Sequence, residues 1–385
     1  MLTRRLMIPF ILLLSGVRAV VGDDLQIEYL GHISVPIVPY DDEVFARGHH
    51  FGYSRGTFCY IPERDTFLMV GHPYAQEFAE FSNPGPGKRA KIVHGFVDVT
   101  QGALARQERE TDSQINIQSL LYDRGRVYVS SEMWYNVAGA FIRTHGSFQP
   151  NLDNPEFSGW WRIGDWSGQL TGYYMARIPD RFVEDGNWLL TGASISWRAG
   201  GSSGPCAILA NPDGAVEGAR VPSSELLIYR AEQDVPRRLD FTSPLHKGVS
   251  LYPGSVEGWM GGCHVGGAAV VGNRLIFFGR QGKGYDFYGT NEDYTRLTKL
   301  KDTFEGKGYK SGPYEAAMWI YNLDALNKGD RSVVRMTFPW AVSSFGRDDL
   351  RNACVHGDRL YVSETGAEVA GEDPIPVIHV LKISE

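Results

Sequence analysis

Carboxylates gather in short polar segments that precede apolar runs in the second half of the chain. Glu257 stands before one such run, and Asp348 and Asp349 stand before another. Hydrolysis of a glycosidic bond requires two carboxyl groups that flank the bond, one as acid and the other as base or nucleophile. Glu257 with Asp348 or Asp349 could form such a pair. The same carboxylates could instead cap turns or pair with Arg347 and Arg351.

Histidines offer a second chemistry, the elimination of a uronic acid. This reaction needs a base near the acidic sugar ring and a cation that binds the sugar carboxylate. His49, His50 or His264 could act as the base. Tyr53 could act as the acid, and Arg55 could bind the carboxylate. Because adjacent histidines are also common at protein surfaces, the first two could equally have no catalytic role.

A divalent metal is a possible cofactor, because histidine and carboxylate side chains are ordinary metal ligands. The cluster that the sequence offers for this role consists of His49, His50, His264 and Glu257. The sequence contains no Cys-x-x-Cys pair, which argues against a thiolate metal site or a redox motif. The identity of any metal or other cofactor stays open at this point.

Polar and aromatic residues in similar segments form the predicted substrate-binding set. Arginine and amide side chains hydrogen-bond sugar hydroxyls and acids, while Trp and Tyr rings offer flat faces to a sugar. The residues that we assign to this set are Arg55, Asn116, Gln118, Tyr173, Trp259, Arg280, Arg351 and Asn352. Each aromatic member could alternatively belong to the hydrophobic core.

A short recurring pattern supplies the elements that must position these residues. It runs from a polar residue through a brief apolar segment to Gly or Ser. The copies begin at Thr66, Arg126, Asn187, Arg274 and Arg359. Short segments rich in β-branched and aromatic residues favour buried strands over helices. Apolar stretches that end in turns lie upstream of most copies, and each pair predicts a β-hairpin.

Four-stranded units repeated along a chain are typical of a β-propeller, and five copies predict five blades. The last unit ends at residues 377–383 as a third strand without a fourth. Residues 25–30 can supply the missing strand, which leaves no free sheet edge. We therefore predict an all-β fold, a five-bladed β-propeller closed by pairing an N-terminal strand with the C-terminal blade. The alternative is a β-sandwich. Cys59 and Cys354 should lie on neighbouring inner strands.

Several segments resemble a group of uncharacterised secreted β-propeller proteins from environmental bacteria. The segments are 168–179, 203–209, 267–271, 278–284 and 376–381. The resemblance covers residues 115–383 in pieces and implies the same propeller architecture. Because this group has no assigned activity, the resemblance transfers no catalytic residue.

The N-terminus has the features of a secretory signal. Arg4 and Arg5 precede the apolar run 6–14, and small residues follow up to Gly22. The run is too short to span a bilayer. We expect a signal peptide at 1–22 and a single propeller domain at 23–385, secreted or periplasmic, with no membrane partner after cleavage. The formal charge of −7 and the lack of a basic run after the N-terminus argue against a nucleic-acid partner.

These observations lead to two functional hypotheses of different classes. Inner strands of a propeller begin around one opening, and connecting loops there carry function. The first hypothesis is a secreted carbohydrate-active protein that acts on or binds a polysaccharide at the channel mouth, with hydrolysis ahead of uronate elimination. The alternative is a non-catalytic ligand- or protein-binding propeller scaffold, in which the long loop at 281–314 could dock a protein.

Overall fold

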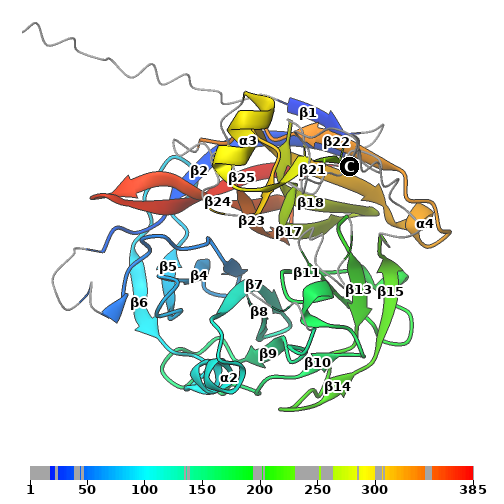
Figure 1. Cartoon of the computed structure of the whole chain (residues 1–385). Helices are drawn as coiled ribbons and strands as arrows, with labels where there is room; N and C mark the ends of the chain where they lie inside the picture. The colour runs from blue at the N-terminus through cyan, green and yellow to red at the C-terminus, as the bar shows by residue number, and fades with distance from the viewer. Residues whose placement is uncertain are drawn as a thin grey trace, which may run out of the picture.

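Short buried strands dominate a computed structural model of the chain. The model describes residues 18–21, 25–38, 44, 47–133, 136, 139–193, 202, 204–229, 251–252, 263–283, 286–299, 306, 308–342 and 349–384. Most of the strands lie in five antiparallel sheets arranged around a central axis (Figure 1). The fold is a five-bladed β-propeller, as the repeated pattern predicted.

The strands of each blade follow one another from the axis outward. Blade 1 consists of β3 (Phe58–Ile61), β4 (Thr66–Val70), β5 (Phe78–Ser82) and β6 (Ile92–Val97). Blade 2 consists of β7 (Ile115–Asp123), β8 (Arg126–Met133) and β9 (His145–Phe148). Blade 3 consists of β11 (Tyr174–Arg177), β12 (Leu189–Gly192), β13 (Ala207–Ala210) and β15 (Ser223–Leu227). Blade 4 consists of β17 (His264–Val271), β18 (Arg274–Gly282), β21 (Tyr314–Asn322) and β22 (Val333–Thr337).

Blade 5 joins the two ends of the chain. It consists of β23 (Leu350–His356), β24 (Arg359–Ala370), β25 (Asp373–Ser384), β2 (Leu25–Ser34) and β1 (Arg18–Val21). The register of β2 on β25 pairs Ile27 with Ile383 and His32 with His379. The expected closure by residues 25–30 and 377–383 is therefore confirmed. Since the closing strand pairs along its length, β25 presents no open edge there.

Helices and short strands lie between and upon the blades. The helices are α2 (Ala103–Thr111), α3 (Asn291–Thr298) and α4 (Leu323–Leu326), with 3-10 turns at Gly168–Leu170 and Asp180–Phe182. A parallel pair joins β10 (Arg162–Ile163) to β14 (Arg220–Val221). A further small sheet contains β16 (Leu251–Tyr252), β19 (Asp286–Gly289) and β20 (Gly308–Lys310). No described helix is long and apolar enough to cross a membrane.

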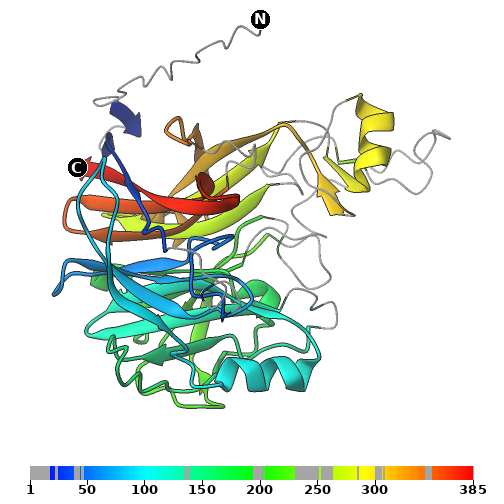
Figure 2. The ribbon, with the colours of Figure 1, turned by 90° about the vertical axis from the view of Figure 1, so that its left-hand side faces the viewer.

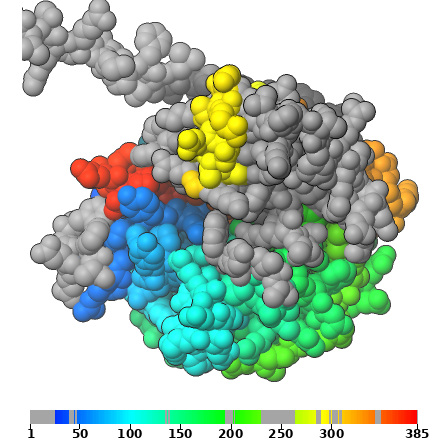
Figure 3. Space-filling model, viewed as in Figure 1, coloured from blue at the N-terminus to red at the C-terminus, as the bar shows by residue number. Residues whose placement is uncertain are grey.

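The five inner strands β3, β7, β11, β17 and β23 surround the axis, and each lies against its neighbours on both sides. Helix α2 ends shortly before β7 begins, so the face that carries α2 is the face at which the inner strands start. We call it the mouth face. Helix α3 stands above the same face in the side view (Figure 2), and it lies at the surface in the space-filling view (Figure 3).

Large aromatic side chains fill the space between blades. Tyr174 on β11 is fully buried, and its hydroxyl donates to the carbonyl of Cys206 at 2.7 Å. Trp319 on β21 is also fully buried in the same core cluster.

Cys59 and Cys354 lie on the neighbouring inner strands β3 and β23, as expected, and are free thiols. Burial raises the pKa of Cys354 to about 12, so this thiol is protonated at neutral pH.

Candidate functional site at the channel mouth

Three side chains from two blades make contact where β17 and β23 begin. Asp349 precedes β23, and its Oδ2 accepts a hydrogen bond from Nη2 of Arg351 at 2.8 Å. Its Oδ1 lies 3.2 Å from Nδ1 of His264, the first residue of β17. Nη1 of Arg351 lies 3.2 Å from Nε2 of the same imidazole. These contacts connect the inner strands of blades 4 and 5 at the mouth face.

Two glycines allow β23 to approach β17 closely enough for these contacts. A Cβ atom on Gly266 would lie 2.7 Å from Cδ of Arg351 and 2.4 Å from the carbonyl oxygen of Leu350. A Cβ atom on Gly267 would lie only 2.0 Å from the carbonyl oxygen of Arg351. Since such distances are below van der Waals contact, larger residues here would push the strands apart.

The protonation states follow from burial and neighbouring charge. Burial, together with the charge of Arg351, lowers the pKa of His264 to about 4. Burial alone would raise the pKa of Asp349, but Arg351, His264 and Arg280 outweigh it and hold that pKa well below its ordinary value. At neutral pH the imidazole is therefore neutral and the carboxylate ionised. Because Nε2 accepts from Arg351, the proton of the neutral imidazole lies on Nδ1, the nitrogen that faces Oδ1 of Asp349.

Two further guanidinium groups lie near this cluster. Arg55 precedes β3, and burial, followed by the nearby charge of Arg351, lowers its pKa. Arg280 lies beside His264 across the β17–β18 pair, with its guanidinium 4.6 Å from the ring centre of Tyr314. Within the part of the chain that the structure describes, neither guanidinium group makes a hydrogen bond or an ion pair. Nε of Arg280 is buried without a hydrogen-bond partner among these residues.

An aromatic ring and a carboxylate from blades 2 and 3 complete the surroundings. The ring of Tyr173, which precedes β11, meets the imidazole of His264 edge-on at 5.6 Å. Glu132 ends β8 and accepts a hydrogen bond from Nε2 of Gln118 at 3.2 Å, and both side chains are buried. Tyr173 and Glu132 are also electrostatic neighbours of Arg55. The mouth thus combines groups from all five blades.

Asn352 has a structural role and does not line an open surface, contrary to its predicted place among the binding residues. It is buried, and its Nδ2 donates to the carbonyls of Phe58 and Leu120. Its Oδ1 accepts from the hydroxyl of Ser119 at 2.6 Å. The amide therefore links β23 to β3 and β7 inside the channel. Asn116 is likewise buried, beside Glu132 in the β7–β8 pair.

The paired histidines occupy blade 1 at the same face. Nε2 of His49 lies 2.7 Å from Oε2 of Glu77, and its ring stacks on Phe96. The imidazole of His50 is buried, and its ring centre lies 4.8 Å from that of His72. Tyr53 is 55% exposed and also meets His72. These contacts lie within blade 1, and none of them reaches His264.

Three predicted residues, Glu257, Trp259 and Asp348, lie outside the described residues. Of the two carboxylates at the mouth, Asp349 was predicted as an alternative to Asp348, and Glu132 was not predicted. A signal for Glu132 was present in the sequence, because Glu132 and Glu364 end two copies of the recurring pattern. Among the described residues, no group of three or more His, Cys, Asp or Glu side chains could hold a metal ion.

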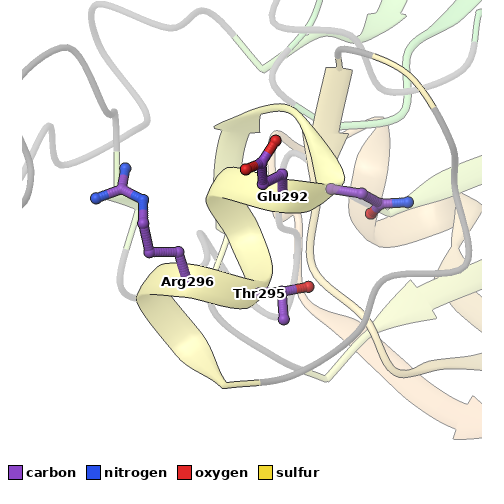
Figure 4. Close-up of a pocket in the computed structure, with 4 residues that line it drawn as sticks. Glu292, Thr295 and Arg296 are labelled. Atoms are coloured by element: carbon purple, nitrogen blue, oxygen red, sulfur yellow. The ribbon is translucent and has the colours of Figure 1, made fainter.

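A surface pocket lies on α3, away from these contacts. It is lined by Asn291, Glu292, Thr295 and Arg296 (Figure 4). All four of these described lining residues belong to one helix. The mouth cluster, in contrast, presents groups from several blades and is the stronger candidate site.

Comparisons with known proteins leave the function of this chain open. No protein-family model and no curated protein matches the chain. A glycosyl hydrolase from Bacteroides ovatus is 8% identical over 86% of this chain and 84% of its own, with a TM-score of 0.38. An exo-1,5-α-L-arabinanase from a bovine ruminal metagenomic library is 10% identical over 86% of this chain and 93% of its own, with a TM-score of 0.40. At this distance the function must be argued from the site itself.

Proposed function

We propose that the protein is a carbohydrate-active propeller that binds a polysaccharide across the mouth of its channel and cleaves it. The observation that carries the proposal is the contact network of Asp349, His264 and Arg351, with the ring of Tyr173 against it. Fixed hydrogen-bonding groups beside an aromatic ring are what recognition of a hydroxyl-rich ring requires. Arg55 adds a cation to the same opening.

Hydrolysis is the first candidate reaction, because it needs two carboxyl groups and the mouth holds Asp349 and Glu132. Asp349 stays ionised, which suits a base or nucleophile. The acid would be Glu132 or the originally predicted Glu257. Uronate elimination is the second candidate, and a specific observation favours it. His264 is a neutral imidazole beside a tyrosine and several guanidiniums.

The test incubates the purified protein with neutral and acidic polysaccharides and measures reducing ends and unsaturated uronate absorbance. Hydrolysis produces reducing ends alone, whereas elimination also produces the ultraviolet absorbance. The variant Asp349→Asn should lose most of the activity. Asp358→Asn is the matched control, because Asp358 lies in the β23–β24 turn at the opposite end of the same strand and its exposed carboxylate pairs with Arg359. Binding without any product would favour the non-catalytic scaffold. The absence of both binding and product would overturn the proposal.

Export is a separate part of the proposal and rests on the N-terminal sequence. Arg4, Arg5 and the apolar run 6–14 support cleavage of residues 1–22, which would remove the outermost strand β1, and a secreted or periplasmic protein. Mass spectrometry of the protein from an exporting host would test this. A mature chain beginning near residue 23 is expected, and an intact N-terminus in the cytosol would contradict it.

A further inference from the structure

Around the Asp349–His264–Arg351 cluster, the described side chains include three guanidiniums and two carboxylates. Three guanidiniums, those of Arg55, Arg280 and Arg351, are electrostatic neighbours of Asp349. Glu132 is a second carboxylate whose charge lies near Arg55. Even with both carboxylates ionised, one cation stays uncompensated within this set. The imidazole between them is neutral and adds no charge.

Only some of these charged groups contact one another in the described part of the chain. Oδ2 of Asp349 accepts a hydrogen bond from Arg351, whereas Oδ1 lies 3.2 Å from Nδ1 of His264 and has no hydrogen-bond partner among the described residues. The guanidinium groups of Arg55 and Arg280 have no hydrogen bond or ion pair to any described residue, and the Nε atoms of Arg280 and Arg351 are buried without a hydrogen-bond partner there. Burying a charge without a partner is costly. A protein that retains two such guanidiniums at one opening is therefore suited to receive an anion.

We infer that the bound saccharide is anionic, and that its carboxylate or sulfate group lies between Arg55 and Arg280, against the Asp349–His264–Arg351 cluster. The fork of a guanidinium matches the two oxygens of a uronate carboxylate or of a sulfate ester. Tyr173 would pack against the ring that carries the anion. The inference rests on the proposed function and deepens it by naming the substrate class.

Calorimetric titration tests the inference with four probes. These are polygalacturonate, its carboxyl-reduced neutral counterpart, a sulfated galactan, and inorganic sulfate. We expect the neutral counterpart to bind weakest and affinity for the anionic probes to fall as salt is raised. Stronger binding of polygalacturonate identifies a uronate site, and stronger binding of the galactan identifies a sulfate-ester site. Equal binding of the neutral and charged polymers would overturn the inference while leaving the proposed function intact.

The variant Arg55→Gln gives the sharper result. Loss of a charged hydrogen bond should weaken the binding of the anionic polymer by about tenfold to a hundredfold. Arg359→Gln is the matched control, because Arg359 begins β24 at the opposite end of β23 and pairs with Asp358. Since the guanidinium group of Arg55 has no hydrogen-bonding partner among the described residues, the unliganded variant should be at least as stable as the unmodified protein. An unchanged affinity would overturn the inference.

Inorganic sulfate separates failure of the inference from failure of the proposed function. If no polymer binds but sulfate raises the melting temperature of the unmodified protein and not of Arg55→Gln, the anion site stands and the proposed carbohydrate function fails. If neither the polymers nor sulfate binds, both are wrong.

Discussion

Nδ1 of His264 lies 3.2 Å from Oδ1 of Asp349, across the boundary between blades 4 and 5. The first residue of β17 thereby contacts the residue that precedes β23, so one pair both joins two blades and faces the channel mouth. Neither side chain is more than 18% exposed. Because the pair is largely desolvated, changing either residue should affect both folding and ligand binding.

The first prediction concerns the carboxylate of this pair. Asp349→Asn removes the negative charge that faces Arg351, Arg280 and His264. Removing one partner from a buried ionic cluster costs about 3–5 kcal/mol, because the remaining charges stay uncompensated. Urea denaturation should show this loss, whereas the exposed control Asp358→Asn should change stability by no more than about 0.5 kcal/mol. Equal denaturation midpoints for the two variants would show that Asp349 does not stabilise the cluster.

The second prediction concerns pH. Burial and Arg351 lower the pKa of His264 from 6.5 to about 4 in the folded protein. Asp349 acts to raise this pKa and Arg280 acts to lower it. The ring of Tyr173 packs against the imidazole. As pH falls, the unfolded chain binds the proton first. The neutral imidazole therefore makes its full contribution to the free energy of unfolding above pH 6.5, and this contribution is lost between pH 6.5 and about 4. The loss amounts to at most about 3 kcal/mol.

The measurement compares urea stability against pH for the unmodified protein and His264→Gln. The variant should have the shallower slope between pH 6.5 and about 4. Other buried histidines, such as His145, whose pKa burial lowers to about 3, titrate in both proteins and cancel in the difference. Parallel curves would show that His264 titrates alike in the folded and unfolded states.

The third prediction concerns Asn352, which was first assigned to the substrate. Asn352→Ala leaves the carbonyls of Phe58 and Leu120 and the hydroxyl of Ser119 without this partner. Each buried polar group left unsatisfied costs about 1–3 kcal/mol. We expect a large fall in the urea midpoint with ligand affinity retained in the folded fraction. A stable variant that no longer binds ligand would instead restore the original assignment.

The sequence predicted the architecture well because its signals were local. Each copy of the recurring pattern, such as the one at Arg274, became the second strand of a blade, since a short apolar run between turns fits a buried strand. The closure at Ile27 and Ile383 was predictable because the last unit lacked a fourth strand and an unpaired edge is unfavourable.

The site was predicted less completely, because its contacts depend on register across different blades. Arg351 and Asn352 are adjacent in sequence, yet the first belongs to the mouth cluster and the second to the channel interior. Successive strand residues point to opposite sides, and a bulge near Leu350 shifts the pairing of β23 with β24. Neither feature leaves a signal in composition. Likewise, the pairing of His49 with Glu77 depends on a loop conformation that the spacing of these residues does not specify.

The last prediction concerns the closure of the ring. Nε2 of His379 on β25 lies 2.8 Å from Oε2 of Glu364 on β24, and its Nδ1 lies 3.1 Å from the hydroxyl of Tyr29 on β2. Glu364 also accepts from the backbone amide of Val342 at 2.8 Å. Since Glu364 and His379 are fully buried, this chain of hydrogen bonds connects the N-terminal strand to the last two strands without access to water.

Glu364→Ala should therefore destabilise the protein by about 3–5 kcal/mol, because the imidazole and the amide lose a buried acceptor. Glu364→Gln is the matched control. Its amide oxygen can accept from both groups, so it should lose much less stability. Urea denaturation gives the magnitude, and size-exclusion chromatography shows whether loosening of β2 exposes the edge of β25 to self-association. If the Ala and Gln variants unfold at the same urea concentration, the closure depends on strand pairing and packing, with no measurable contribution from this hydrogen-bond chain.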